Sequence, residues 1–232
     1  MLGSPQFRQI TANSLLYVVA SLALVLPVGL LSAIALQALG QFGVALRTLL
    51  LVPWTLSMAV VAAFWLWLLN PSYGLLAFGL GELGIEPGLM LGDPVLALPL
   101  MVLVTAWWSF PYATVMMSAA LQSVPRELYE AVDIDGGGTI ARFRYVTWPH
   151  LAATLGSTGL ALAITYLTLI TLIIVLTGGG PIGATTTWSF EIFRNTVQSV
   201  DISPAAVLSV VVLIVNLALG FAYMRWTGRT VG

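Results

Sequence analysis

Five long stretches of this 232-residue sequence contain no charged side chain and no histidine. Each reaches the roughly 20 residues that a helix needs to cross the hydrocarbon core of a bilayer. They cover residues 15–39, 48–69, 95–121, 151–177 and 204–223. A transmembrane β-barrel would show shorter segments of alternating polarity. The sequence therefore predicts an all-α, polytopic helical membrane protein with five visible transmembrane helices.

The composition agrees with lipid as the solvent for this chain. Charged residues make up 7% of the sequence and hydrophobic residues 59%, whereas soluble domains carry about a quarter charged residues. The absence of cysteine excludes disulfides and cysteine-based chemistry. His150 is the single histidine, and it has no cluster of acidic residues around it in the sequence. We therefore expect no metal site and no cofactor.

The arginines predict the orientation, because the chain has no lysine. If residues 122–148 form a cytoplasmic loop, six arginines lie on the cytoplasmic side and two outside, which satisfies the positive-inside rule. The cytoplasmic set is Arg47, Arg126, Arg142, Arg144, Arg225 and Arg229, and the external set is Arg8 and Arg194. This predicts an external segment 1–14, a transmembrane domain 15–224 and a cytoplasmic tail 225–232. The N-terminus then lies outside and the C-terminus in the cytoplasm.

Four prolines lie within or at the edges of the predicted spans: Pro27, Pro53, Pro99 and Pro111. A proline bends a helix because it removes one backbone donor and crowds the preceding turn. In a membrane such bends are tolerated when neighbouring groups satisfy the freed carbonyls. We interpret these prolines as ordinary helix shaping rather than as moving hinges.

The loop 122–148 holds four acidic residues and three arginines in a chain that is otherwise almost free of charge. It reads as a short helix, a glycine break and a second short helix. Pro125 suits the first turn of the first helix, and Gly136 stops that helix because glycine adopts the left-handed conformation at little cost. Pro149 is expected to end the second helix. A short amphipathic helix of this kind can lie in a groove of a partner protein, although composition alone favours a solvated connector.

The same loop resembles the EAA loop of permeases from binding-protein-dependent ATP-binding-cassette (ABC) importers. That pattern runs Glu-Ala-Ala, three residues, Gly, nine residues, Ile, one residue, Leu-Pro. Glu130, Ala131, Gly136 and Pro149 match it with the spacing intact. Val132, Val146 and Trp148 replace an alanine, an isoleucine and a leucine of the pattern.

Further segments are similar to the carbohydrate branch of that family, specifically its maltose- and glycerol-phosphate-type first permease subunit. They are 47–54, 67–74, 121–125, 177–181 and 185–187. The resemblance implies a type I ABC importer permease fold. Members usually carry six or more spans, and residues 5–14 resemble the external segment before the family's second span, so the family's first span is expected to be missing here.

The resemblance also implies function and partners. A cytoplasmic ATPase dimer, a second permease subunit and an external substrate-binding protein would act with this chain in a bacterial or archaeal plasma membrane, and no nucleic acid is expected. The substrate would be a sugar or related polyol. The chain itself would not be an enzyme, because ATP is hydrolysed by the partner. The residues implied in ATPase coupling are Glu127, Glu130, Ala131, Asp135 and Gly136.

Polar faces on the uncharged spans suggest a substrate pathway. On the fourth span, Thr165, Thr168 and Leu172 continue a face of alternating three- and four-residue steps that begins at Thr154. Hydroxyls, amides and aromatic rings suit sugars, although small polar residues also favour helix packing. The candidate pathway residues are Thr165, Tyr166, Thr168, Leu172 and Asn216.

Two other functional classes are left as alternatives. An ion-coupled secondary transporter usually places ionisable residues near the bilayer midplane. The uncharged spans argue against proton coupling, although sodium can be bound by carbonyls and hydroxyls. A membrane-embedded enzyme is the weakest alternative, because no acid, base and nucleophile occur together in or beside the spans.

Overall fold

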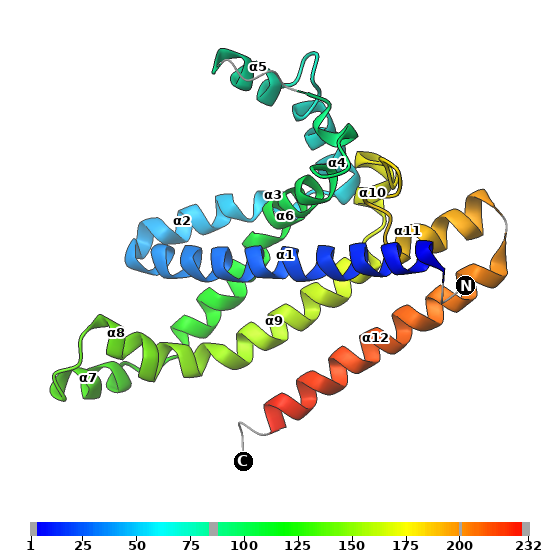
Figure 1. The fold of residues 1–232 in the computed structure, drawn as a ribbon. Helices are drawn as coiled ribbons and strands as arrows, with labels where there is room; N and C mark the ends of the chain where they lie inside the picture. The colour runs from blue at the N-terminus through cyan, green and yellow to red at the C-terminus, as the bar shows by residue number, and fades with distance from the viewer. Residues whose placement is uncertain (1–3, 84–87, 200, 229–232) are drawn as a thin grey trace.

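The computed structural model describes residues 4–83, 88–199 and 201–228, and the regular elements in this part of the chain are all helical (Figure 1). The all-α prediction is confirmed. The α-helices are α1 Pro5–Ala38, α2 Gly40–Leu50, α3 Val52–Thr55, α4 Met58–Leu68, α5 Leu75–Glu82, α6 Ala97–Gln122, α7 Arg126–Ile134, α8 Thr139–Arg142, α9 Trp148–Thr168, α10 Thr171–Leu176, α11 Trp188–Phe193 and α12 Ile202–Gly228. Short turns complete them: the 3₁₀ turn η1 Met90–Gly92 and the π-helical turns η2 Phe143–Thr147 and η3 Arg194–Gln198.

The membrane-spanning character of the chain follows from helix length and composition. Within the described residues, four helices are long and apolar enough to cross a membrane: Pro5–Ala38, Ala97–Gln122, Thr139–Thr168 and Ile202–Thr227. The bent pair Ala45–Thr55 and Met58–Leu68 makes a fifth span if it is counted as one. The expectation of five apolar spans is thus confirmed, but two of them depart from a straight helix.

The first helix begins earlier than predicted. Ser4 caps it, because its Oγ accepts a hydrogen bond from the backbone N–H of Phe7 at 3.2 Å, and Pro5 occupies the first helical position. Residues 5–14 are therefore the first turns of α1, and residues 1–3 lie outside the described part. The polar composition of these turns hid the helix from a search based on hydropathy.

The second predicted span is broken rather than continuous. Its two parts meet at an angle of 91°. Pro53 lies in the short α3, Leu56 is extended at ψ 142°, and the Ser57 side chain then caps α4. The helix thus continues past Pro53, and the chain leaves the helical conformation at Leu56.

The fourth predicted span ends at Thr168, and α10 starts only at Thr171. Leu169 is extended, with ψ 104°. The Thr168 hydroxyl bonds to the carbonyls of Ile164 and Thr165 in its own helix, and such local bonds compete with helix continuation. The Ser189 hydroxyl of α11 donates to the Leu169 carbonyl at 3.4 Å, which satisfies a group that the break exposes.

The core lies where α1, α6 and α9 pack together. Gly29 allows the closest approach of α1 to α6, because a Cβ at this position would lie 2.6 Å from Cβ of Ala113. Tyr17 of α1 and Tyr166 of α9 are almost completely buried, at 1% exposure each. Their hydroxyls bond to Thr105 and Ser109 of α6. Helices that approach this closely through a small residue are typical of membrane bundles.

The two ends of the bundle are formed by different helices. The start of α1, α11 and the start of α12 lie at one end, whereas α7, α8 and the end of α12 lie at the other (Figure 1). Between the ends, α12 exposes a long apolar surface that suits contact with lipid or with a second membrane subunit. It includes Val210, Leu213, Ile214, Leu217, Phe221 and Met224.

Candidate functional site

The helix α7 forms the core of the predicted coupling loop. Pro125 precedes its first residue in extended conformation, and Glu127 lies in its first turn, where a negative charge complements the helix dipole. Gly136 follows the helix at φ +75°. The predicted helix and its glycine stop are both present in the structure.

The five predicted coupling residues lie together and are exposed on or directly after α7: Glu127, Glu130, Ala131, Asp135 and Gly136. Ile134 at the end of the same helix is 86% exposed, although isoleucine is normally buried. The structure thus gathers a charged and apolar surface at one end of the bundle. Contact between this surface and another protein is not part of the structure, so the coupling role stays a prediction.

Sequence reasoning did not foresee an ion pair that closes this loop. Asp133 of α7 accepts two hydrogen bonds from Arg142 of α8, from Nε to Oδ1 at 2.6 Å and from Nη2 to Oδ2 at 2.5 Å. The two residues are nine positions apart across a glycine break, so only the folded loop shows that they meet.

Pro149 does not end the second helix of the loop, contrary to the prediction. The chain passes from α8 through the π-helical turn η2 into α9, with Pro149 in the first turn of α9. A wider π turn can accommodate a residue that lacks a backbone donor. Residues 139–168 therefore form one continuous helical rod.

At the opposite end, α1 holds the loop that connects α10 to α11. Asn13 donates hydrogen bonds to the carbonyls of Gly183 and Thr186, at 2.9 and 3.1 Å. The Ser14 hydroxyl accepts from the backbone N–H of Trp188 at 2.9 Å. Hydropathy gave no sign that these polar residues of α1 would organise a distant loop.

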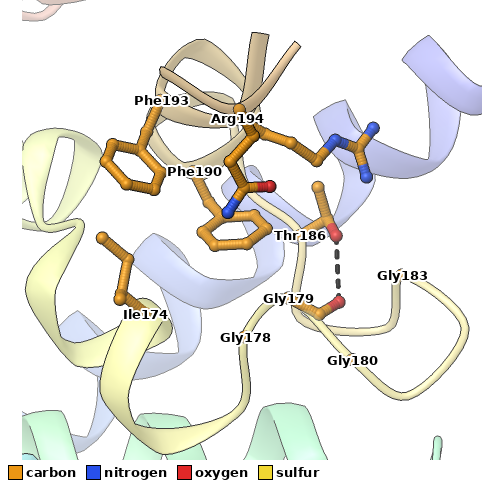
Figure 2. Close-up of a pocket in the computed structure, with 10 residues that line it drawn as sticks. Ile174, Gly178, Gly179, Gly180, Gly183, Thr186, Phe190, Phe193 and Arg194 are labelled. Atoms are coloured by element: carbon orange, nitrogen blue, oxygen red, sulfur yellow. Dashed lines mark hydrogen bonds between the residues drawn. The ribbon is translucent and has the colours of Figure 1, made fainter. Parts of the chain in front are cut away.

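The same loop borders a cavity of about 260 Å³. Figure 2 shows Ile174 and Phe193 on one side of it, with Arg194 and the loop on the other. Thr186 donates a hydrogen bond to the carbonyl of Gly179 at 2.9 Å, which ties the loop across itself (Figure 2). Gly179 cannot carry a side chain here, because a Cβ would lie 2.3 Å from the ring of Phe190.

An ion pair between the buried Glu191 and the partly exposed Arg194 lies beside this cavity. The Glu191 side chain is 4% exposed, and its Oε2 lies 2.6 Å from Nη2 of Arg194. Gln6 and Asn195 also donate to Oε1 of Glu191. A buried carboxylate is expected to have such partners, and these connect the first turn of α1 with α11 and η3.

The predicted pathway residues of the fourth span divide into two groups. Tyr166 is buried, with its hydroxyl 2.5 Å from Oγ of Ser109, so in this conformation it takes part in packing between α6 and α9. Thr165 is half-buried and Thr168 exposed. Leu172 is fully buried in α10. Because the helix breaks at Leu169, Leu172 does not continue the face of the threonines, contrary to the periodicity argument.

Asn216, the remaining predicted pathway residue, lies on α12 and not on the fourth span. Its Oδ1 atom is shielded from solvent and has no hydrogen-bond partner among the described residues. A shielded amide oxygen of this kind is costly without a partner. Its role in the pathway stays a prediction.

Aromatic rings gather at the bend of the second span. The ring of Trp54 in α3 lies 4.3 Å from that of Trp108 and 4.9 Å from that of Tyr112, both in α6. Trp54 is far from Trp108 and Tyr112 in the sequence, and the fold brings the three rings together. The three rings are partly buried.

The described residues hold no group of three or more histidine, cysteine, aspartate or glutamate side chains that could bind a metal ion. The hydroxyls, amides, aromatic rings and one amphipathic loop helix can bind a neutral polar solute and a partner protein. They contain no assembled acid, base and nucleophile.

Comparison with known proteins decides the family. A family model described as the binding-protein-dependent transport system inner membrane component matches residues 25–229. The chain belongs to this family. Its members are permease subunits of ABC importers, so the chain is a multi-pass membrane permease and is not itself an ATPase. The alternative of an ion-coupled secondary transporter is not supported.

Several relatives of this permease are transporters of sugars or sugar-like solutes. It is 31% identical to the sulfoquinovosyl glycerol permease SmoG of Agrobacterium fabrum, over 97% of this chain and 73% of that protein. It is 34% identical to the trehalose/maltose permease MalF of Thermococcus litoralis, over 78% of this chain and 61% of the relative. It is 33% identical to the sn-glycerol-3-phosphate permease UgpA of Yersinia pestis, over 90% and 72%.

Solved structures confirm the type of fold. A bacterial alginate ABC transporter, crystallised in complex with its alginate pentasaccharide-bound periplasmic protein, contains a chain that matches with a TM-score of 0.87. That match covers 98% of this permease and 80% of the other chain, at 22% identity. An amino acid ABC transporter matches with a TM-score of 0.63 at 16% identity, over 97% and 94%. The ABC permease fold expected from the sequence is thus found.

Proposed function

We propose that this permease forms part of the translocation pathway for a sugar or related polyol and couples it to a cytoplasmic ATPase through α7. The observation that carries the proposal is the exposure of α7 at one end of the bundle, with the five residues implied in ATPase coupling exposed on it or directly after it. A helix that projects from a membrane bundle with exposed Ile134 suits a groove on a partner protein.

The partners follow from the same arrangement. An ATPase dimer would bind α7 and the neighbouring loop on the cytoplasmic side of a bacterial or archaeal plasma membrane. A second permease subunit would cover part of the apolar surface of α12, and an external binding protein would deliver the substrate. The start of α1 would lie outside and the end of α12 inside, in agreement with the distribution of arginines.

The substrate class rests on two independent supports. The names of SmoG, MalF and UgpA describe permeases for sugars, a sugar derivative or glycerol 3-phosphate. The chain also has clustered, partly buried aromatic rings at Trp54, Trp108 and Tyr112, and an exposed threonine at Thr168. Aromatic faces and hydroxyls are the groups that recognise sugars.

Reversing one charge on α7 tests the docking role. In the Glu130→Arg permease, expressed together with its ATPase, we expect at least about a tenfold loss of co-purified ATPase, because a like charge placed in an interface is strongly unfavourable. The matched control is Glu82→Arg, which reverses an exposed charge of α5. Co-purification of each variant on a tagged permease measures the effect.

A second variant addresses the backbone. Gly136→Val places a β-branched residue at φ +75° and should displace the end of α7. Gly138→Val is its control, because Gly138 has φ −87° and open space around a Cβ. If Glu130→Arg and Gly136→Val both retained normal ATPase binding and ATP-dependent uptake of maltose, trehalose or glycerol 3-phosphate, the docking role would be wrong.

A further inference from the structure

Two side-chain contacts join α7 to the helical rod that continues into the membrane. The first is the bidentate pair of Asp133 with Arg142, at 2.5 and 2.6 Å. The second joins the Tyr129 hydroxyl to Oγ1 of Thr147 at 3.1 Å. Arg142 belongs to α8 and Thr147 to η2, so both contacts lead to the same rod, residues 139–168.

Helix α7 is less closely attached to α1 and α6. A cavity of about 350 Å³ lies between the loop and the ends of α1 and α6, and Tyr129 and Arg142 line it together with Ile34, Gln37 and Leu121. The connection from α6 to α7 consists of residues 123–125, which belong to neither helix. The side chains therefore tie α7 to α8 and η2 across the glycine break, with a void on the side of α1 and α6.

The rod ends directly before a break between two helices. It stops at Thr168, directly before the extended Leu169 and the start of α10. A continuous helix can transmit a displacement of one end to the other, whereas a break allows the next segment to change direction. A planar guanidinium bonded to both oxygens of a carboxylate fixes the relative orientation of two segments better than a single hydrogen bond does.

We propose that Asp133 and Arg142 are positioning residues, which clamp α7 to the rod 139–168 so that a movement of α7 reaches the helix break at Leu169. This inference rests on the proposed docking of α7 to an ATPase. Neither residue needs to contact substrate or ATP. Loss of the clamp would leave the ATPase bound and would weaken the link between ATP hydrolysis and transport.

The experiment compares single and double charge changes in the full transporter in lipid vesicles. The variants are Asp133→Asn, Arg142→Gln and the exchange Asp133→Arg with Arg142→Asp. Arg144→Gln is the matched control, because Arg144 is an exposed arginine of η2 whose contact is with the Tyr145 ring. The readout is the number of ATP molecules hydrolysed per molecule taken up, using whichever of maltose, trehalose or glycerol 3-phosphate is transported fastest.

We expect each single variant to raise this ratio about fivefold, the lower end of typical coupling between two sites. Co-purified ATPase should stay unchanged, the exchange should restore most of the coupling, and Arg144→Gln should resemble the parent. An unchanged ratio in both single variants would overturn the proposal. A ratio that rises only in proportion to the loss of bound ATPase would also overturn the proposal. Such a result would mean that the variants impair assembly of the transporter rather than the positioning of α7.

A distance measurement separates this inference from the docking function. The chain has no cysteine, so Arg126→Cys on α7 and Ala153→Cys on α9 give two exposed sites for spin labels. Asp133→Asn should broaden the distance distribution between them even without ATPase, and Arg144→Gln should not. A distance distribution in Asp133→Asn that is as narrow as that of the parent would refute the clamp. If the distribution broadens in Asp133→Asn but the parent permease binds no ATPase, only the docking function is refuted.

Discussion

At the scale of single residues, Tyr166 links three helices of the core. Its hydroxyl lies 2.5 Å from Oγ of Ser109 in α6, and its ring lies 6.1 Å from that of Tyr17 in α1. Thr168, two positions later, is exposed, and its hydroxyl bonds to carbonyls of its own helix. Two neighbouring candidates for the pathway thus have different physical environments, and substitutions should separate their roles.

Tyr166→Phe should lower stability, because it removes one side of a buried hydrogen bond but keeps the ring. We expect a loss of about 1 kcal/mol in the free energy of unfolding, which corresponds to about 2–4 °C in the melting temperature for a chain of this size. Thermal unfolding of the purified permease in detergent measures it. A melting temperature equal to that of the parent would show that the hydroxyl does not hold α6 and α9 together.

Thr168→Ala should instead change selectivity. Its hydroxyl has no inter-helix contact among the described residues, so stability should stay within about 0.5 kcal/mol of the parent. Relative uptake of maltose, trehalose and glycerol 3-phosphate by the reconstituted transporter is the measurement. Identical relative uptake in the parent and the variant would remove Thr168 from the proposed pathway.

At the scale of elements, helix α1 does more than span the membrane. Its first turns hold the loop between α10 and α11 through Asn13 and Ser14, and Gln9 donates a weaker bond to the Ile182 carbonyl at 3.4 Å. This loop contains four glycines with little conformational restriction of their own. The loop therefore takes its shape from hydrogen bonds with α1 as well as from internal bonds such as that of Thr186 with the Gly179 carbonyl.

Asn13→Ala tests this dependence. It leaves the carbonyls of Gly183 and Thr186 without the Asn13 donor, at a cost of about 1–3 kcal/mol where the loop is shielded from water. We expect faster hydrogen–deuterium exchange in residues 178–188, measured by mass spectrometry. Gln9→Ala serves as the control and should change exchange less, because its bond is longer and exposed. Equal exchange in both variants would contradict the role of Asn13.

At the scale of the whole molecule, two strongly exposed isoleucines mark the opposite ends of the bundle. Ile182, in the loop that α1 holds, is 89% exposed, and Ile140 of α8 is 83% exposed. Isoleucine is rarely this exposed. The proposed orientation places Ile182 outside the cell and Ile140 in the cytoplasm, so these positions can report the direction of the chain in the membrane.

Ile182→Cys and Ile140→Cys measure the orientation directly, because the parent has no cysteine. We expect a membrane-impermeant maleimide added to intact cells to label Ile182→Cys and to leave Ile140→Cys unlabelled until the membrane is permeabilised. Labelling of the parent chain is the control. The reverse labelling pattern would show that the orientation inferred from the arginines is wrong.

The sequence by itself determined that lipid surrounds this protein and that its regular elements are helices. Uncharged stretches of bilayer length permit only helices, because lipid offers no partner for free backbone groups. The short loop helix and its stop at Gly136 were also predictable, since they depend on local backbone preferences. The resemblance of the loop then pointed to the family.

Tertiary structure alone decided where the spans break and what holds the loops. Hydropathy does not register the breaks at Leu56 and Leu169, because the residues on both sides of each break are equally apolar. The clamp between Asp133 and Arg142 joins residues across a glycine turn, and the direction of that turn is set by φ +75° at Gly136. Contacts of this kind depend on the path of the chain in space, which local composition does not encode.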